Sequence, residues 1–291
     1  MKTYFTICTL SLALTVGLAV ACKKKTKEPE DEKPAVAENF LDVSYGNDPK
    51  QKFNIYLPAN RTSSTTPVLF LIHGGAWRAG DRTDFNGSID PLKSMFPNYA
   101  FVSLSYRLYA NGTNKFPTQE TDVKNCIDYV LNNHSQYKVS TSFGLLGASA
   151  GAHLSLLYAY KYGNASYKPK AVVSWSGPTD FVSFYHSVSS PLVKTWISDV
   201  VGNVNTADTL LYNASSPARF VSSGSVPTLL IQGQADTVVP YQQSDLLNAK
   251  LNQFNVPHVY KLYPNEGHSY SGNISYDVLI HTQNFLNTYL K

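Results

Sequence analysis

A serine flanked by glycines is the residue of this sequence best suited to covalent chemistry. Ser149 lies in Gly147-Ala148-Ser149-Ala150-Gly151, directly after an apolar run and directly before a helical pattern. Glycines two positions either side permit a sharp, strained strand-to-helix turn that exposes the serine hydroxyl as a nucleophile. The same pattern also occurs as an ordinary turn that packs a helix closely on a strand. Its meaning therefore depends on partners elsewhere in the chain.

A serine hydroxyl needs a neighbouring base, and His268 is the best candidate among the seven histidines. It lies in the glycine-containing loop Asn265–Ser269, after the last strand pattern, where a side chain can reach the edge of a sheet. His134 and His153 fall on helical patterns, where packing or surface roles are expected. The others fall in an insertion, a strand, the final helix and a second motif: His186, His258, His281 and His73.

A carboxylate should orient that histidine, and Asp236 has the expected position. It comes just after the apolar run Thr228–Gln232 and lies between the serine and the histidine in the chain. Asp180 also follows a strand pattern, but the turn around Pro178 suits a structural Asx role. The other rivals lie in the insertion, at a helix start where a cap is expected, and too close to the histidine: Asp199, Asp208, Asp245 and Glu266.

Backbone N–H groups must meet the oxyanion of the tetrahedral intermediate in acyl transfer. One donor is expected from Ala150, directly after the nucleophile. Others are expected from His73-Gly74-Gly75-Ala76-Trp77, which follows the strand pattern Val68–Ile72 and whose glycines allow the backbone to approach a substrate. His-Gly-Gly is also found as a plain strand-terminating turn, but here it precedes the serine motif on a different strand.

The elements that must position these residues alternate from about residue 38 to the end. Short apolar runs and helical patterns in alternation are typical of βα units on a mostly parallel sheet. Runs such as Val68–Ile72 are apolar throughout, so helices should cover both faces. Residues 178–217 break the rhythm and predict a small insertion over the catalytic end, where ligands bind in such sheets. We expect eight strands, at Leu41–Tyr45, Lys52–Leu57, Val68–Ile72, Ala100–Ser105, Phe143–Leu146, Ala171–Trp175, Thr228–Gln232 and His258–Tyr263, and helices at Thr121–Tyr137, Ala150–Tyr162, Ser244–Phe254 and Tyr276–Tyr289.

Together these motifs resemble those of serine esterases of the α/β-hydrolase superfamily. The similarity is to the branch of hormone-sensitive-lipase-like esterases and small bacterial carboxylesterases, and it covers about residues 40–291. It includes Ser105–Leu108, His153 and Ser215–Pro217 besides the motifs above. The resemblance implies an α/β-hydrolase fold, with Ser149, His268 and Asp236 as nucleophile, base and orienting acid.

The oxyanion loop of that family reads HGGxW or HGGG. By its position in the loop, this implies Gly75 and Ala76 as donors beside Ala150. Ala76 stands where HGGG has its third glycine. The alanine keeps its N–H, but we expect a loop less able to adapt to bulky alcohol groups.

The composition is that of one catalytic domain, predicted over residues 38–291. The chain has 291 residues, 43% of them hydrophobic, which is enough for a full core. Its formal charge is only +4, and much of the lysine lies in one short run, so nucleic acid is not an expected partner. Cys8 lies in a predicted signal peptide and Cys22 is a predicted lipidation site, so Cys126 has no cysteine to pair with. Its position in a helical pattern predicts a buried apolar role.

The N-terminal residues predict export. Residues 1–21 have Lys2, an apolar stretch and a final Ala19-Val20-Ala21, as in a secretory signal peptide. Cys22 then completes a sequence resembling a bacterial lipobox, which predicts a lipoprotein anchored in a membrane and facing the periplasm or the cell exterior. Plain signal-peptidase cleavage at the same bond is the alternative. The rest of residues 22–37 is charged and contains prolines, which predicts a disordered tether.

The predicted chemistry is two-step acyl transfer without a metal or an organic cofactor. We expect a serine carboxylesterase acting on short-chain or carbohydrate-linked esters. Trp77 and Trp196 are candidates for lining a pocket for an aromatic group or a sugar ring, although core positions suit them equally. Three alternatives stay open: an acetyl xylan or feruloyl esterase acting on plant polysaccharide, an amidase or formamidase on the same scaffold, and a non-catalytic binding lipoprotein.

Overall fold

The computed structural model describes residues 1–2, 34–162, 167–202 and 209–291. Apart from its first two residues, the predicted signal peptide lies outside the described residues, as do Cys22 and the tether up to residue 33. The chain divides into residues 1–33 and a second unit, Pro34–Lys291, which contains every element below. No helix in the described part of the chain has the length and apolar character needed to cross a membrane.

The second unit is built on one eight-stranded sheet in the order β1-β2-β4-β3-β5-β6-β7-β8. The β1–β2 and β2–β4 pairs are antiparallel, and every other neighbouring pair is parallel. This confirms the predicted mostly parallel sheet. The strands are β1 (Glu38–Ser44), β2 (Lys52–Leu57), β3 (Val68–Ile72), β4 (Ala100–Leu104), β5 (Phe143–Ala148), β6 (Ala171–Trp175), β7 (Thr228–Gly233) and β8 (His258–Tyr263).

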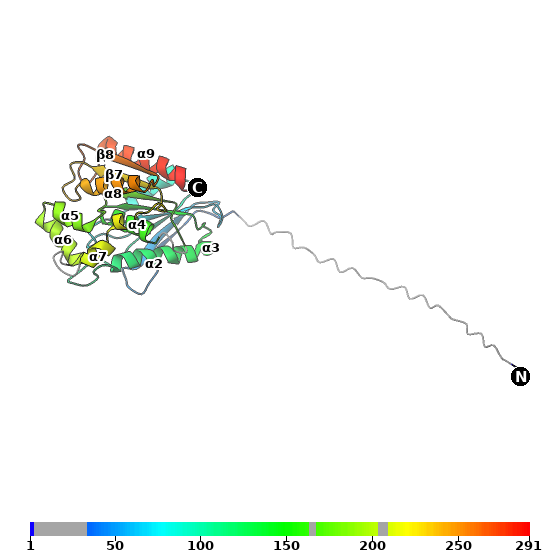
Figure 1. Ribbon diagram of the computed structural model, residues 1–291. Helices are drawn as coiled ribbons and strands as arrows, with labels where there is room; N and C mark the ends of the chain where they lie inside the picture. The colour runs from blue at the N-terminus through cyan, green and yellow to red at the C-terminus, as the bar shows by residue number, and fades with distance from the viewer. Residues whose placement is uncertain (3–33, 163–166, 203–208) are drawn as a thin grey trace. The chain divides into compact units, whose positions relative to one another are not determined.

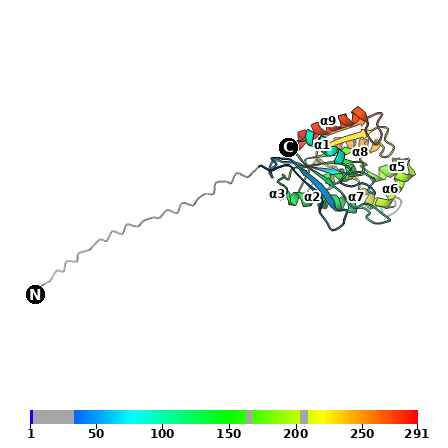
Figure 2. The ribbon, with the colours of Figure 1, turned by 180° about the vertical axis from the view of Figure 1, so that it is seen from behind.

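Helices cover both faces of the sheet, as the continuous apolar runs predict (Figure 1). In β3, Phe70 and Ile72 join the core on one face while Leu69 and Leu71 join the core on the other. Successive side chains of a strand point to opposite faces, so a strand buried on both sides must be apolar throughout. One face carries α2 (Thr118–Asn132), α4 (Ala150–Lys161) and α8 (Gln242–Gln253), and the other, seen in Figure 2, carries α1 (Asn86–Met95) and α9 (Gly272–Tyr289).

One helix was missed, and two local predictions were wrong. Helix α1 was not predicted, because it holds Pro91 in its interior and has no side-chain cap. The single helix expected over Thr121–Tyr137 is two, since Asn133 leaves helical geometry between α2 and α3 (His134–Tyr137). Asp245 does not cap a helix: it lies inside α8, and its carboxylate accepts a hydrogen bond from the Tyr260 hydroxyl at 2.9 Å.

The predicted insertion, residues 178–217, contains α5 (Phe181–Ser187), α6 (Pro191–Val201) and α7 (Thr209–Ala214), which lie together at one end of the domain (Figure 1). A 3₁₀ turn, Pro217–Arg219, completes the segment. The carboxylate of Asp180 caps α5 by accepting the N–H of Ser183 at 2.9 Å, which confirms its predicted structural role.

Candidate active site

Ser149 lies at a sharp elbow between β5 and α4. Its backbone has φ 53° and ψ −120°, a left-handed conformation that L-residues adopt only under constraint. A Cβ on Gly147 would lie 2.2 Å from the Gly151 carbonyl oxygen, and one on Gly151 would lie 1.9 Å from that of Ile72. The two glycines are therefore required by close backbone packing, as the sequence pattern predicts.

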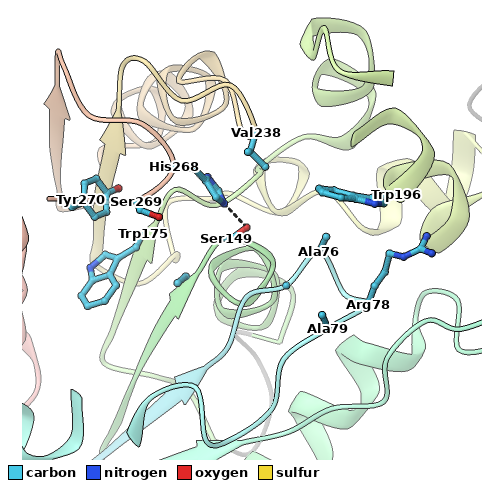
Figure 3. A pocket seen from close by; sticks show the side chains of 12 residues that line it. Ala76, Arg78, Ala79, Ser149, Trp175, Trp196, Val238, His268, Ser269 and Tyr270 are labelled. Atoms are coloured by element: carbon cyan, nitrogen blue, oxygen red, sulfur yellow. Dashed lines mark hydrogen bonds between the residues drawn. The ribbon is translucent and has the colours of Figure 1, made fainter. Parts of the chain in front are cut away.

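Three side chains predicted from separate parts of the sequence meet at this elbow. The His268 Nε2 atom lies 2.9 Å from Ser149 Oγ, and its Nδ1 atom lies 2.7 Å from Asp236 Oδ2 (Figure 3). Because the carboxylate accepts the proton of Nδ1, it leaves Nε2 as the nitrogen that accepts from the serine. The order of contacts is hydroxyl, imidazole, carboxylate.

The protein holds the Asp236 carboxylate in a fixed orientation. Its side chain is fully buried, and Oδ1 accepts the backbone N–H groups of Val238 and Val239 at 2.8 and 2.9 Å. Oδ2, which faces His268, also accepts from Gln232 Nε2 at 3.1 Å. These donors keep a buried negative charge satisfied, so the carboxylate can lie beside the imidazole without water.

The rival carboxylates bond elsewhere. Asp208 lies outside the described residues. The others bond to groups away from the imidazole: Asp180 to Ser183 and Arg219, Asp199 to Arg78, Asp245 to Tyr260 and Glu266 to Ser271.

Two of the three predicted oxyanion donors line the pocket that contains Ser149, and the third follows the serine in the chain. Gly75 and Ala76 have positive φ angles, 95° and 51°, and line the same pocket as Ser149. Ala150 is the first residue of α4, where a helix leaves its N–H without an intrahelical partner. Within the described part of the chain, no acceptor bonds to the N–H of any of these three residues. Each N–H can therefore donate to a bound group.

A buried histidine supports the oxyanion loop from behind. The His73 ring is stacked on Tyr106, with ring centroids 4.2 Å apart, and its Nδ1 bonds to the Gly74 carbonyl at 2.8 Å. Burial lowers the pKa of His73, so its ring stays neutral. The Tyr106 hydroxyl donates to the His73 carbonyl at 3.0 Å. His73 thus has a packing role in this loop.

A pocket of about 740 Å³ opens over the serine, a size typical of small-molecule sites. Trp196 on α6 lines it, as predicted. Trp77 is only 3% exposed and packs among the rings of Phe116, His153 and Phe181, but it also borders a small cavity beside Ser149. The residues lining the pocket that were not predicted from the sequence are Arg78, Ala79, Ala148, Trp175, Val238, Ser269 and Tyr270 (Figure 3). Trp175 ends a predicted strand, and Tyr270 lies two residues after His268. Their positions in the sequence were therefore the only signal that could have identified them as pocket residues.

Tyr270 fastens the segment that follows His268. Its hydroxyl donates to the Ile231 carbonyl at 3.0 Å and lies 2.7 Å from Ser176 Oγ, at the ends of β7 and β6. Burial raises the pKa of Tyr270, so the hydroxyl keeps its proton. The contact ties the histidine loop to the sheet edge that carries Ser149.

An eight-stranded, mostly parallel sheet with a serine at a strand-to-helix elbow defines the class of α/β hydrolases. Within this class, the chain belongs to the BD-FAE family, whose model matches residues 53–251.

Individual relatives have esterase names. The chain is 28% identical over 219 residues to the probable carboxylic ester hydrolase LipM of Mycobacterium tuberculosis, a match that covers 72% of this chain and 50% of LipM. It therefore spans about half the length of that curated relative. A truncated carbohydrate esterase from gut microbiota has a TM-score of 0.74 at 22% identity, covering 88% of this chain and 98% of that one. A bifunctional GH43-CE protein of Bacteroides eggerthii has a TM-score of 0.72 at 24% identity, covering 84% and 38%. The two structural similarities concern the fold.

Proposed function

We propose that this protein is a serine carboxylesterase in which Ser149, His268 and Asp236 are the catalytic residues. The observation that carries the proposal is the continuous chain of contacts from Ser149 Oγ to His268 at 2.9 Å and from His268 to Asp236 at 2.7 Å. Such a chain activates a hydroxyl that is a poor nucleophile by itself at neutral pH.

The reaction has two steps with balanced proton transfers. Ser149 Oγ attacks the ester carbonyl while His268 Nε2 takes its proton, and the same nitrogen then protonates the departing alcohol. The acyl group is left on the serine. In the second step His268 takes a proton from a water molecule, whose oxygen attacks the acyl carbonyl, and returns that proton to Ser149 Oγ as the acid leaves.

The oxyanion of each tetrahedral intermediate would accept the N–H groups of Gly75, Ala76 and Ala150. Donors fixed before the reaction stabilise developing charge without reorganisation, and removal of one such donor costs about 3 to 4 kcal/mol of barrier in known cases. The positive φ angles of Gly75 and Ala76 support this role, because they turn successive N–H groups away from regular secondary structure.

For the substrate class, we propose short-chain or carbohydrate-linked esters. The pocket offers the ring of Trp196 near the serine (Figure 3), and an aromatic ring can pack against the apolar face of a sugar. The relatives named carboxylic ester hydrolase and carbohydrate esterase point in the same direction.

The test is hydrolysis of p-nitrophenyl acetate and of acetylated xylan by wild-type protein and by Ser149→Ala. We expect the variant to lose at least about 10⁴-fold in kcat, since residues of such a unit fail together. Thr141→Ala, an exposed position near the start of β5, is the matched control and should keep full activity. Equal rates for Ser149→Ala and wild type would end the esterase proposal.

We also propose that the protein is exported and anchored through a lipid on Cys22. The proposal depends on the apolar N-terminal stretch and the Ala19-Val20-Ala21-Cys22 sequence. Wild-type protein produced in a bacterial host should fractionate with membranes and enter the detergent phase of a detergent–water partition. Cys22→Ser should release it to the aqueous phase; membrane association unchanged in that variant would refute lipidation.

A further inference from the structure

A buried glutamine lies next to the loop that carries Asp236. Gln232 is on β7, a strand buried along its whole length, and its own side chain has no exposure to solvent. A polar side chain in such a place costs free energy unless its groups are hydrogen-bonded. Both ends of the Gln232 amide have partners, and these partners connect it to the catalytic carboxylate.

The amide nitrogen of Gln232 bonds to the loop at three places. Nε2 lies 3.2 Å from the Gly233 carbonyl oxygen, 3.1 Å from Asp236 Oδ2 and 3.1 Å from the Val239 carbonyl oxygen. Gly233 and Val239 lie on either side of Asp236 in the chain. Carbonyl and ionised carboxylate oxygens only accept hydrogen bonds, so the NH₂ end of the amide must face them. Gln232 thus closes the loop around the carboxylate.

A serine on α8 holds the other end of the amide. The Ser244 hydroxyl donates to Gln232 Oε1 at 3.0 Å, and Ser244 is buried. A reversed amide would place Oε1 against three acceptor oxygens, whereas the observed one gives Oε1 the donor that it needs. The two sets of contacts keep the NH₂ group directed toward Asp236.

Gln232 and His268 share one oxygen of Asp236. His268 Nδ1 lies 2.7 Å from Oδ2, the same atom that accepts from Gln232 Nε2. A hydrogen bond donated to a carboxylate oxygen offsets part of its negative charge, so this oxygen attracts a positively charged imidazolium less strongly. Gln232 thereby favours the neutral imidazole, which is the form that can take the proton of Ser149.

The other charged or titratable groups around His268 have partners of their own. They come from the loop of His268, the oxyanion loop with α6, and α8: Tyr270 with the Ile231 carbonyl, Glu266 with Ser271, Arg78 with Asp199, and Asp245 with Tyr260. In the described part of the chain, His268 and Gln232 are the only side chains that bond to the Asp236 carboxylate. Gln232 is therefore the side chain best placed to adjust it.

We propose that Gln232 is a positioning residue of the catalytic unit, which holds the Asp236 loop in place and keeps His268 an unprotonated base down to lower pH. The inference goes beyond the proposed esterase function and depends on it. Gln232 does not line the pocket over Ser149, so its effect passes through Asp236.

The experiment is the pH profile of kcat/KM for p-nitrophenyl acetate in wild type and Gln232→Met. Methionine has a similar length and volume but cannot donate. We expect the acidic limb of the profile to move to higher pH by about 0.5 to 1 unit, the effect of one hydrogen bond to a carboxylate. On the plateau, kcat should fall by about tenfold with KM changed less than about twofold, because the loop is less well fixed.

Ser244→Ala is a milder second variant. It keeps the donor of Gln232 but removes the hydroxyl that holds the amide, so the acidic limb should move in the same direction by a smaller amount. An acidic limb at the wild-type pH in both variants would overturn the proposal, and so would a shift to lower pH.

The matched control is Gln119→Met on α2. Gln119 is also fully buried, and its Nε2 donates to a backbone carbonyl, that of Asn114, at 2.6 Å. The substitution removes the hydrogen bond of a buried amide away from the triad, so it matches the cost in stability. We expect the acidic limb to stay at the wild-type pH even where the free energy of unfolding falls. A shift equal to that in Gln232→Met would mean general loosening and refute the role of Gln232.

A second readout needs no turnover. Proton NMR follows the Nδ1–H resonance of His268 as the pH is changed, and absence of the resonance in His268→Gln assigns it. The midpoint of this titration should rise in Gln232→Met by the same amount as the acidic limb. A raised midpoint in a protein that hydrolyses esters no faster than Ser149→Ala would refute the esterase function alone. An unchanged midpoint in an active protein would refute the role of Gln232 alone.

Discussion

Ser149 lies at the carboxyl ends of the strands, which we call the catalytic edge of the sheet. This edge and the helices that cover it are held in place by different kinds of contact. At the edge, hydrogen bonds between backbone groups hold the loops. The Ser149 N–H donates to the Trp175 carbonyl at 2.7 Å, and the Ala235 N–H donates to the Glu266 carbonyl at 2.9 Å. The covering helices α5 and α6, which we call the cover, are held in place mainly by the packing of apolar side chains such as Phe184 and Ile197.

The difference separates two tasks. Hydrogen bonds between backbone groups fix positions to a few tenths of an ångström, and proton transfer between Ser149 and His268 needs that precision. Apolar packing fixes volume and shape but accepts substitution of similar side chains. We therefore expect substitutions at the edge to change turnover, and substitutions in the cover to change the choice of substrate.

The largest effect is expected at the edge, from Asp236→Asn. The amide fills the same space but cannot stabilise an imidazolium ion, and its NH₂ group would favour the wrong tautomer of His268. We expect kcat to fall by about 10⁴-fold, as in other triads. Steady-state kinetics with p-nitrophenyl acetate measures the loss. Asp245→Asn, a carboxylate on α8 that bonds to Tyr260, is the control, and equal losses in the two would remove Asp236 from the triad.

The second-largest effect is expected on stability at low pH, from His153, which lies where α4 contacts the segment that contains Ser215. His153 on α4 donates Nε2–H to the Ser215 carbonyl at 2.7 Å and packs against Trp77 and Phe181. Burial lowers the pKa of His153 to about 4, partly offset by the bond to Ser215. An unfolded histidine titrates near 6.5, so the unfolded chain takes up a proton that the folded chain excludes as pH falls from about 6.5 to about 4. This costs up to about 3 kcal/mol of stability across that window.

His153→Asn isolates that contribution. The amide can still donate to Ser215 but has no titration in this range, so the free energies of unfolding of variant and wild type should converge as pH falls from 7 to 4.5. Urea denaturation at several pH values measures the difference. A gap of constant size would contradict the low pKa of His153.

A smaller effect at the edge is expected from Tyr270→Phe. Loss of the hydroxyl removes the contact with Ser176 Oγ and one of the two hydrogen bonds to the Ile231 carbonyl, which keeps the N–H of Ser176, and it loosens the segment after His268. We expect kcat to fall by about tenfold with KM changed less than about twofold, about 1.4 kcal/mol of transition-state stabilisation. Tyr260→Phe, whose hydroxyl contacts Asp245 away from the site, should change neither constant. A rise in KM alone would assign Tyr270 to substrate binding instead.

The smallest effect is expected where the cover meets the oxyanion loop. Arg78 forms an ion pair with Asp199 on α6 and lies over the Tyr109 ring at 5.0 Å. Both charged side chains are about one-third exposed, so water and salt weaken the pair. Asp199→Asn should raise KM by about two- to fivefold with little change in kcat, and 0.5 M salt should reduce the difference. Asp128→Asn, which breaks the similar pair on α2, should leave both constants unchanged.

Features of the catalytic edge that depend on local sequence patterns could be predicted from the sequence. The glycine pattern around Ser149 and the strand-end positions of Asp236 and His268 are local features, and the structure brings these three residues together as predicted. The continuous apolar run of β3 likewise specified a sheet covered on both faces.

The pocket walls could not be predicted in the same way. Trp77 and Trp196 were equally plausible from sequence, yet only Trp196 lines the main pocket, whereas Trp77 is buried and borders a small cavity beside Ser149. Tyr270 and Ser176 meet across two strand ends, a contact that no local pattern encodes. Helix α1 carries Pro91 and no cap, so its formation depends on packing of Ile89 and Leu92 against the sheet.

The left-handed backbone of Ser149 has a consequence for the design of more stable variants. Such a conformation costs a side-chain-bearing residue about 1 to 3 kcal/mol, and the surrounding packing holds it in place. Glycine adopts the same angles without that cost, so Ser149→Gly should melt at a higher temperature than the wild type while having no nucleophile. At this one position, selection for thermal stability and selection for turnover favour different amino acids.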